Sequence, residues 1–352
     1  MKRYLWLAIL TLLLGTVGLA APIKVIPVVP HDPIDRLAQT AVVLEPWHYE
    51  NLTIYPVRLT GLLDAPDVLT MDEAMDRGVL YISETGSVNE VIANNRGGRP
   101  VFLMAGELIG GAKQDRTIRD DALIGPNGRV RVAVYCVEAH RWTGGAEFSP
   151  LKGVLSGQIR QSARAKASQQ AVWGAVAEAQ EAAKAPSATG AFRSVYESRD
   201  VQRTIIPYKE KMGPMLSRHR DVYGVIVVAG GRLVVADIFG DRSVFERLWS
   251  KLLDSYAVST FQVSIGQHIW SREDAQRLVR RIAYMRQSNM YTSGLGRLVR
   301  LEGGEMLGSA LVWDYAVMHL ELFPGGPRIL PMEQRPLPSP DQRRQRLEER
   351  IR

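Results

Sequence analysis

The sequence predicts a single large α+β domain, with largely antiparallel sheets and a helical segment in the middle of the chain. Three observations favour this fold class. Residues 21–150 contain short β-branched and aromatic runs separated by turn signals, so they are predicted to be mainly β. Residues 151–220 are predicted to be helical, because residues 163–185 within them are rich in Ala, Gln and Glu. Residues 221–323 carry strand and helix patterns in turn, as an α+β segment does.

The first part of the domain is expected to hold a short helix among several strands. Thr70 and Glu73 are spaced as a capping box, and Gly78 is placed to end that helix. The strands are recognised as β-branched and apolar runs between turns, such as the turn at residues 125–128. They are expected at residues 51–59, 79–84, 88–93, 100–104, 116–124 and 130–138.

The middle and the last third complete the predicted domain. Helices are expected over residues 163–185 and 200–212. Ser243 and Ser271 are each placed to cap a further helix that has an apolar stripe. Two glycine pairs indicate hairpins. The remaining strands are expected at residues 223–228, 233–239, 298–301, 306–313 and 317–323.

The first 20 residues are typical of a cleavable signal peptide. Lys2 and Arg3 precede an apolar run over residues 5–19, and Gly18-Leu19-Ala20 offers small residues at a cleavage site. An uncleaved membrane anchor is the alternative, although the run is shorter than the ~20 residues that a spanning helix needs. We therefore expect an extracytoplasmic protein, either periplasmic or secreted.

Residues 324–352 form a basic tail rich in proline and arginine, and its shortage of apolar residues predicts disorder. The formal net charge is +7; Lys2 and Arg3 carry two of these charges and the tail a net three, which leaves +2 on the body. A body with so little charge is not expected to bind nucleic acid. The tail is expected either to be solvated or to make weak contact with a membrane surface or cell-wall polymer.

The familiar signatures of metal and cofactor sites are absent from the sequence. There is no His-Glu-x-x-His, Cys-x-x-Cys, Gly-x-Ser-x-Gly or phosphate-binding glycine loop, so neither a metal nor a cofactor is expected. Cys136 is the single cysteine, and its strand-like surroundings predict a buried structural thiol. His268 and His319 sit among apolar residues and are expected to be core or edge groups.

One polar stretch, residues 106–117, departs from ordinary surface composition. Glu107 follows a glycine at the end of an expected strand, and a glycine pair then makes a turn. Gln114, Asp115 and Arg116 follow, and they offer an amide, a carboxylate and a guanidinium fork in one place. Strand alternation puts Gln114 and Arg116 on one face of the strand and Asp115 on the other.

A second polar cluster, Glu138 with Arg141 and Trp142, ends the next expected strand. Glu138 shares its strand face with residues that are expected to point inward. Its carboxylate therefore needs a partner, and the guanidinium of Arg116 or Arg141 would serve.

Two interpretations of these clusters remain open. In one, they form a buried network of ion pairs and hydrogen bonds that only stabilises the turn. In the other, they line a pocket in which Glu107 or Glu138 is the catalytic general base and Trp142 stacks on a flat group. The ligand-binding residues of that pocket are Gln114, Asp115, Arg116, Arg141 and Trp142.

The two clusters also carry a family resemblance. The motifs in question are Gly106-Glu107-Leu108, Gly110-Gly111-x-x-Gln114-Asp115-Arg116, Cys136-Val137-Glu138-x-x-Arg141-Trp142, Gln170-Ala171-Val172-Trp173, Gly308-Ser309-Ala310-Leu311, His319 and Phe323. In this order they resemble the ARG and rhodanese-phosphatase-superfamily-associated protein domain, ARPP-1, over roughly residues 52–323. This chain has Ala139-His140 where the family motif reads Glu-Arg-Gly-Arg-Trp or Glu-Gln-Gly-Arg-Trp.

The resemblance implies an α+β domain from a family named for its genomic neighbours, which are ADP-ribosylglycohydrolases and rhodanese- or phosphatase-like enzymes. That association implies nucleotide-like or ADP-ribose-like ligands. Two functions are expected as alternatives. In the first, an exported protein binds or hydrolyses a small anionic ligand of this kind in a polar pocket. In the second, it is a non-catalytic binding or scaffold protein of the cell envelope.

Overall fold

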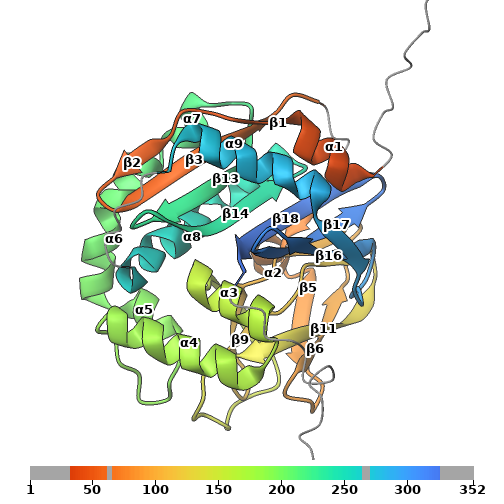
Figure 1. Ribbon diagram of the computed structural model, residues 1–352. Helices are drawn as coiled ribbons and strands as arrows, with labels where there is room; N and C mark the ends of the chain where they lie inside the picture. The colour runs from red at the N-terminus through yellow and green to blue at the C-terminus, as the bar shows by residue number, and fades with distance from the viewer. Residues whose placement is uncertain (1–31, 62–65, 264–269, 326–352) are drawn as a thin grey trace, which may run out of the picture.

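The structure, a computed structural model, describes residues 32–61, 66–263 and 270–325 (Figure 1). The expected signal peptide, residues 1–20, lies outside the described residues, and so does the expected tail beyond residue 325. Within the described part of the chain, no helix is long and apolar enough to cross a membrane.

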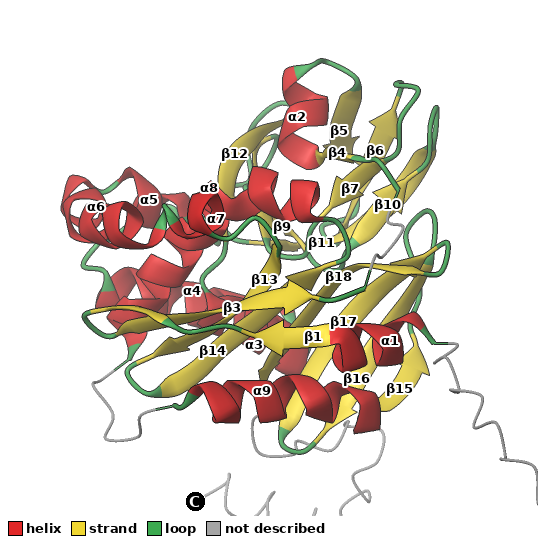
Figure 2. Ribbon diagram, turned by 90° about the horizontal axis from the view of Figure 1, so that it is seen from above, coloured by secondary structure: helices red, strands yellow, loops and turns green. Residues whose placement is uncertain are grey.

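A nine-stranded antiparallel sheet forms the centre of the fold (Figure 2). The two hairpins expected at the glycine pairs are both present, as β13–β14 and β16–β17. The sheet joins distant parts of the chain, because the first hairpin lies between β3 and the final strand, β18. In sheet order the strands are β1 (Ala41–Val43), β3 (Leu52–Leu59), β13 (Val222–Ala229), β14 (Arg232–Phe239), β18 (Ala316–Pro324), β17 (Met306–Trp313), β16 (Arg297–Gly303) and β15 (Arg286–Asn289), with β2 (Trp47–Tyr49) paired to β3.

Helices cover both faces of this sheet. On one face, α1 and α9 pack on a core that includes Tyr55, Ile226 and Leu320. On the other face, the apolar side of α8 packs on a core that includes Ile54 and Val227. The elements are α1 (Pro33–Thr40), α9 (Arg272–Arg281) and the 3₁₀ turn η2 (Ile282–Tyr284) on the first face, and α8 (Arg242–Ser259) with the 3₁₀ turn η1 (Thr260–Gln262) on the second.

Two helix starts test the expected caps. Ser271 begins α9 with a complete capping box to Asp274, as predicted. The cap expected at Ser243 is wrong, because α8 begins after Asp241. The Asp241 carboxylate accepts a hydrogen bond from the Ser243 backbone N–H at 2.6 Å, so Ser243 already lies inside the first turn.

A six-stranded antiparallel sheet curls above the large sheet. Its end strands meet through an isolated bridge between Ser83 and Glu147, and this closure encloses a separate apolar core. The strands in order are β12 (Phe148–Val154), β8 (Glu107–Gly111), β9 (Arg116–Ile118), β11 (Arg129–Cys136), β6 (Glu90–Asn95) and β5 (Leu80–Glu84). Beside them lie a small sheet of β10 (Ala122–Ile124), β7 (Val101–Leu103) and β4 (Leu69–Thr70), and the helix α2 (Met71–Asp76), which begins with the predicted Thr70–Glu73 capping box.

One expected strand is divided. Residues 116–124 form β9 and β10, which belong to different sheets. The break falls at Asp120 and Asp121, whose carboxylates are hydrogen-bonded to Arg164 and to the Ala105 backbone N–H. Each aspartate bonds to a partner outside the strand, and the chain turns between the sheets at this point.

The helical middle is also divided. The helix expected over residues 163–185 is two helices, because Ala167 has a left-handed φ of 46°. Ser168 then caps the second helix by accepting a hydrogen bond from the Ala171 backbone N–H. The helix expected over residues 200–212 is confirmed. The helices of this region are α3 (Gly157–Lys166), α4 (Gln169–Ala182), α5 (Arg193–Glu197), α6 (Arg199–Met212) and α7 (Met215–Arg218). The predicted fold class, α+β with largely antiparallel sheets in one domain, is thereby confirmed.

Two glycine substitutions should have opposite effects on stability. A Cβ at Gly308 of β17 would lie 2.0 Å from the Glu321 carbonyl oxygen on β18, so Gly308→Ala should lower the free energy of unfolding by about 1–3 kcal/mol. Gly174 is exposed within α4 and has no neighbour within 4 Å of such a Cβ, so Gly174→Ala should raise it by about 0.5–1 kcal/mol. The shift in the urea midpoint measures both, and equal shifts would contradict the packing argument.

Candidate functional site

Four of the residues predicted from sequence come together at the ends of β8, β9 and β11. The Glu138 carboxylate accepts a hydrogen bond from the Asp115 backbone N–H at 3.0 Å. The Gln114 amide nitrogen donates to the Glu138 carbonyl oxygen at 2.6 Å. Arg141 pairs with both carboxylates, at 2.7 Å to Glu138 and 3.2 Å to Asp115. Glu138, Gln114 and Asp115 are fully buried.

Arg141 has no N–H group left for a ligand. Its Nε donates to Glu138, and one Nη donates to the carbonyl oxygens of Ala112 and Thr143, both at 2.9 Å. The other Nη donates to the Gly111 carbonyl oxygen and to Asp115, both at 3.2 Å. A guanidinium has five N–H donors, and all five are engaged within the protein. Arg141 therefore ties the loop that follows β11 to the β8–β9 turn.

The pKa shifts of Glu138 and Asp115 are consistent with a structural role for this network. Burial alone would raise the pKa of Glu138, but hydrogen bonds from Arg141 and Thr189 outweigh it and hold that pKa below its usual range. For Asp115, burial prevails over the attraction of Arg193 and raises the pKa. Trp142, beside Arg141, has 54% of its surface exposed.

Arg116 reaches the edge of the same network from its other side. Its guanidinium donates to the Gln114 amide oxygen at 3.2 Å and pairs with Glu84 at 3.3 Å. It also contacts the sulfur of Cys136, which is buried as expected. Burial raises the pKa of that thiol despite the nearby Arg116. Arg116 is thus held inside the protein rather than presented to solvent.

Glu107 belongs to a different cluster. Its carboxylate contacts the ammonium group of Lys251 on α8 and accepts a hydrogen bond from the Met104 backbone N–H at 2.7 Å. Lys251 also pairs with Asp72 of α2 at 2.6 Å. Burial would lower the pKa of Lys251, but the two carboxylates raise it. The two predicted catalytic carboxylates, Glu107 and Glu138, therefore share no partner, and their catalytic role stays a prediction.

Sequence reasoning missed a second buried network, which joins α3 to the large sheet. Arg160 of α3 pairs with Asp237 of β14 at 2.7 Å and with Glu321 of β18 at 2.9 Å. Arg164, one turn later, pairs with Glu321 and with Asp120, both at 2.6 Å. These side chains are almost fully buried, and each arginine bridges two carboxylates.

His319 of β18 completes this second network. Its Nδ1 lies 2.8 Å from an Asp121 oxygen and its Nε2 lies 3.2 Å from an Asp237 oxygen. Burial would lower the pKa of His319, but the two carboxylates outweigh it and raise the pKa to about 10. The imidazole is therefore doubly protonated at neutral pH, and both nitrogens donate. Arg160 and His319 together hold the pKa of Asp237 well below its usual range, against the effect of burial.

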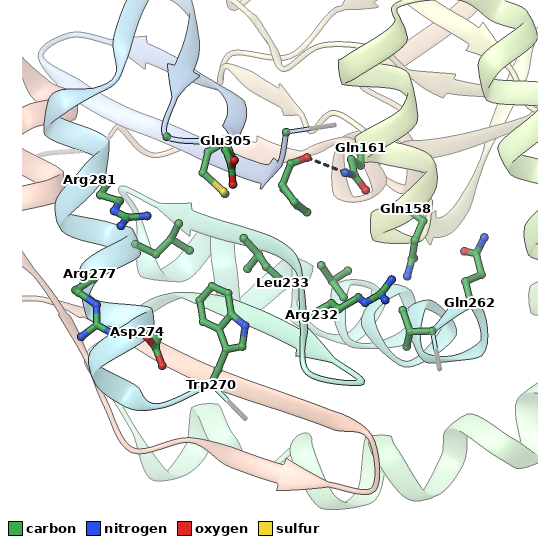
Figure 3. Close-up of a pocket in the computed structure, with 17 residues that line it drawn as sticks. Gln158, Gln161, Arg232, Leu233, Gln262, Trp270, Asp274, Arg277, Arg281 and Glu305 are labelled. Atoms are coloured by element: carbon green, nitrogen blue, oxygen red, sulfur yellow. Dashed lines mark hydrogen bonds and ion pairs between the residues drawn. The ribbon is translucent and has the colours of Figure 1, made fainter. Parts of the chain in front are cut away.

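A cleft of about 680 Å³ lies next to this network (Figure 3). The same elements build both, because α3 sends Gln158 and Gln161 to the cleft, β14 contributes Arg232 to Val234, and β18 ends there. Helix α9 and the β16–β17 turn form the remaining walls. The lining residues include Gln158, Gln161, Arg232, Leu233, Val234, Gln262, Trp270, Asp274, Arg277, Leu278, Arg281, Glu305 and Met306.

The polar groups of the cleft differ in whether they already have partners. Arg277 contacts Asp274 of the same helix, and the Gln161 amide donates to the Pro324 carbonyl oxygen at 2.7 Å. Arg232 and Arg281 are exposed, and neither has an ion pair within the described residues. The amide nitrogen of Gln262 likewise has no hydrogen bond there, while its oxygen accepts from Ser156 at 3.2 Å. The cleft therefore offers two free cations and a free donor around an apolar floor.

A second hollow of about 610 Å³ lies on the curled sheet beside β5 and β12. The guanidinium of Arg96 covers the ring of Tyr81 there, with 4.2 Å between its central carbon and the ring centroid. Charged and apolar groups line this hollow too, but it has only the outer faces and edges of strands and one end of α2 as walls. The cleft at α3 and α9 draws on more elements and is the stronger candidate for a binding site.

Comparison with known proteins identifies a family. The model of the ARG and Rhodanese-Phosphatase-superfamily-associated Protein domain matches residues 40–323, which is most of the chain. The chain belongs to this family. No curated protein and no solved structure matches this chain.

The residues that carry the family resemblance do not line the cleft, and several of them belong to the two buried networks. Gln114, Glu138 and Arg141 belong to the first network, and His319 belongs to the second. Ser309, from another motif, donates to Glu321 at 3.2 Å. A sequence signal for the second network exists: Asp237, His319 and Glu321 are ionisable residues inside otherwise apolar strands, where each must have a partner.

Glu138→Gln tests the structural role of the first network. The substitution keeps the shape but leaves Arg141 with a weaker partner, so the free energy of unfolding should fall by about 1–3 kcal/mol. Glu147→Gln is the matched control, because Glu147 is exposed and should change stability by less than about 0.5 kcal/mol. Urea unfolding of both variants is the measurement. Equal stability of Glu138→Gln and the unchanged protein would contradict that structural role.

His319 predicts a pH dependence of stability. Its pKa is raised to about 10 in the folded protein, so the folded state keeps a proton that the unfolded state loses above about pH 6.5. The contribution is complete below pH 6.5 and is lost as pH rises towards 10. Between pH 6.5 and pH 10, the unfolding free energy of His319→Asn should decrease less than that of the unchanged protein. The two decreases should differ by roughly a few kcal/mol. Parallel pH profiles would show that His319 is not protonated at neutral pH.

Proposed function

We propose that this protein binds a small anionic ligand in the cleft between α3, β14 and α9, and that it does so without catalysis. The observation that carries the proposal is the pair of arginines, Arg232 and Arg281, that line a cleft without an ion pair in the described part of the chain. Such guanidinium groups form strong, charge-assisted hydrogen bonds with phosphate and carboxylate oxygens. The cleft volume also falls in the range of small-molecule sites.

The uncharged groups of the cleft are consistent with a ligand that carries hydroxyl groups. Gln262 offers an amide donor, and Leu233 and Leu278 offer an apolar surface for a ring. Nucleotide-like and ADP-ribose-like molecules combine phosphate, hydroxyl and ring in this way. They are therefore the first ligands to test.

The proposal omits hydrolysis because the two carboxylates that the sequence predicts to be catalytic do not line the cleft. Glu107 and Glu138 are engaged in ion pairs elsewhere, and Asp274 is engaged in the cap of α9. Glu305, which lines the edge of the cleft, is exposed on a turn. A general base must lie within hydrogen-bond reach of the proton that it removes, and neither Glu107 nor Glu138 lines the cleft.

Export is part of the same proposal. The charged start, the apolar run over residues 5–19 and the small residues up to Ala20 support a cleaved signal peptide and an extracytoplasmic site of action. The basic residues after 325 support weak contact with an anionic surface. The signal peptide and the basic residues concern where the protein acts, and neither determines which ligand the cleft binds.

Isothermal titration of the purified protein with phosphate, AMP and ADP-ribose tests the proposed site. Arg232→Gln and Arg281→Gln should each weaken binding of an anion by about tenfold, since each removes a charge-assisted hydrogen bond. Arg280→Gln is the matched control, because Arg280 is an exposed arginine of α9 that lines neither the cleft nor the second hollow. Binding should also weaken as salt is added, because the two arginines are exposed.

Two results would count against the proposed function. Equal affinities in the two cleft variants and in Arg280→Gln would place the anion outside the cleft. Release of a hydrolysis product from ADP-ribose during the titration would show that the protein is catalytic after all.

A further inference from the structure

We infer that the ligand of the cleft is an elongated molecule with an acidic group at each end and an uncharged middle. The inference rests on the proposed function, since it concerns the same cleft, and it narrows the ligand class. ADP-ribose carries its charge on a central diphosphate between two uncharged ends, so it does not fit this arrangement. It adds that Arg232 and Arg281 bind different groups of one molecule. The argument depends on where the two arginines lie, on which other charges are already engaged, and on what lies between them.

The two arginines belong to opposite walls of the cleft. Arg232 begins β14, on the side that Gln158 and Gln262 share, whereas Arg281 ends α9, on the side of the β16–β17 turn (Figure 3). In this view the labelled side chains of Leu233 and Trp270 lie between the two guanidinium groups. With Leu233 and Trp270 between them in this view, the two guanidinium groups are placed to bind two different acidic groups of one ligand.

The other charges of the cleft sharpen this arrangement. Arg277 lies on the same helix as Arg281, but its contact with Asp274 neutralises it. Glu305 projects from the turn at the edge of the cleft and has no ion pair in the described part of the chain. Its negative charge disfavours an anionic group near it. Among the described lining residues, the free positive charges are thus those of Arg232 and Arg281, and Glu305 disfavours negative charge next to the β16–β17 turn on the Arg281 side.

The floor between the arginines is apolar. Leu233 and Leu278 are buried core residues that also line the cleft, and Met306 lies beside them. Burying an apolar stretch of ligand on this floor is favourable by roughly 25 cal/mol per Å² removed from water. A charged or strongly hydrated middle would lose its water without gaining a partner. The volume of about 680 Å³ leaves room for such a middle.

A series of straight-chain acids tests the inference directly. Titration with α,ω-dicarboxylates of increasing length, each matched to the monocarboxylate of equal chain length, measures whether a second acid end adds affinity. We expect at least one dicarboxylate to bind about tenfold more tightly than its matched monocarboxylate, because the second end binds intramolecularly. The chain length of the tightest binder then reports the separation of the two arginines.

Two cleft variants and a control test whether each arginine binds one end of the dicarboxylate. In Arg232→Gln and in Arg281→Gln, the advantage of the dicarboxylate should fall to roughly twofold, which is the statistical factor for two equivalent ends at one remaining arginine. Arg280→Gln is the matched control, because Arg280 precedes Arg281 on α9, is exposed and does not line the cleft. The tenfold advantage should persist in that variant.

The outcomes separate this inference from the proposed function. Monocarboxylates and dicarboxylates that bind equally well, with both losing affinity in Arg232→Gln or Arg281→Gln, would overturn the two-ended ligand and leave the anion site standing. A dicarboxylate advantage that survives in both cleft variants would also overturn it. No binding of either acid, together with no binding of phosphate, AMP or ADP-ribose, would overturn the proposed function itself.

Discussion

The attachment of α3 to the large sheet rests on buried charge. Arg160 bridges Asp237 and Glu321, and therefore joins three elements that are far apart in the sequence. A buried pair adds little net stability compared with apolar packing, yet removing one partner leaves the other charge buried and unpaired, which typically costs about 3–5 kcal/mol. The network thus fixes one position of α3 and excludes others. The cleft depends on that position, because Gln158 and Gln161 reach it from the same helix.

The charges of this network nearly cancel, and that balance requires a protonated His319. Arg160, Arg164 and His319 supply three positive charges, and the opposing carboxylates are Asp120, Asp121, Asp237 and Glu321. Arg119, which pairs with Asp120 at 2.7 Å, offsets the remaining negative charge. With a neutral imidazole, Asp121 and Asp237 would face each other through a group that has only one donor. The raised pKa of His319 is therefore a consequence of the packing of β18, not a sign of proton transfer.

Local rules predicted much of the fold, and longer-range interactions decided the rest. Capping boxes at Thr70 and Ser271 and hairpins at the two glycine pairs depend on residues within one turn of each other, so the sequence displays them directly. The division of residues 116–124 could not be read in this way. It depends on Asp120 and Asp121 bonding to Arg164 and to the Ala105 backbone, which lie in other elements. The α3–α4 break at Ala167 is similar, because alanine is a strong helix former and gives no local warning.

The candidate site shows the same division between local and distant information. Sequence reasoning identified the polar residues that meet at Glu138 and Arg141, because they are close along the chain and stand out from their strands. The guanidinium of Arg141 is saturated within the protein, and a saturated donor has nothing to offer a ligand. Arg232 and Arg281 look ordinary in the sequence, since exposed arginines are common. Only the fold brings them to one cleft and leaves both without a carboxylate partner in the described part of the chain. In this protein, free hydrogen-bond donors therefore distinguish a binding surface from a structural network, and clustering of charged residues does not.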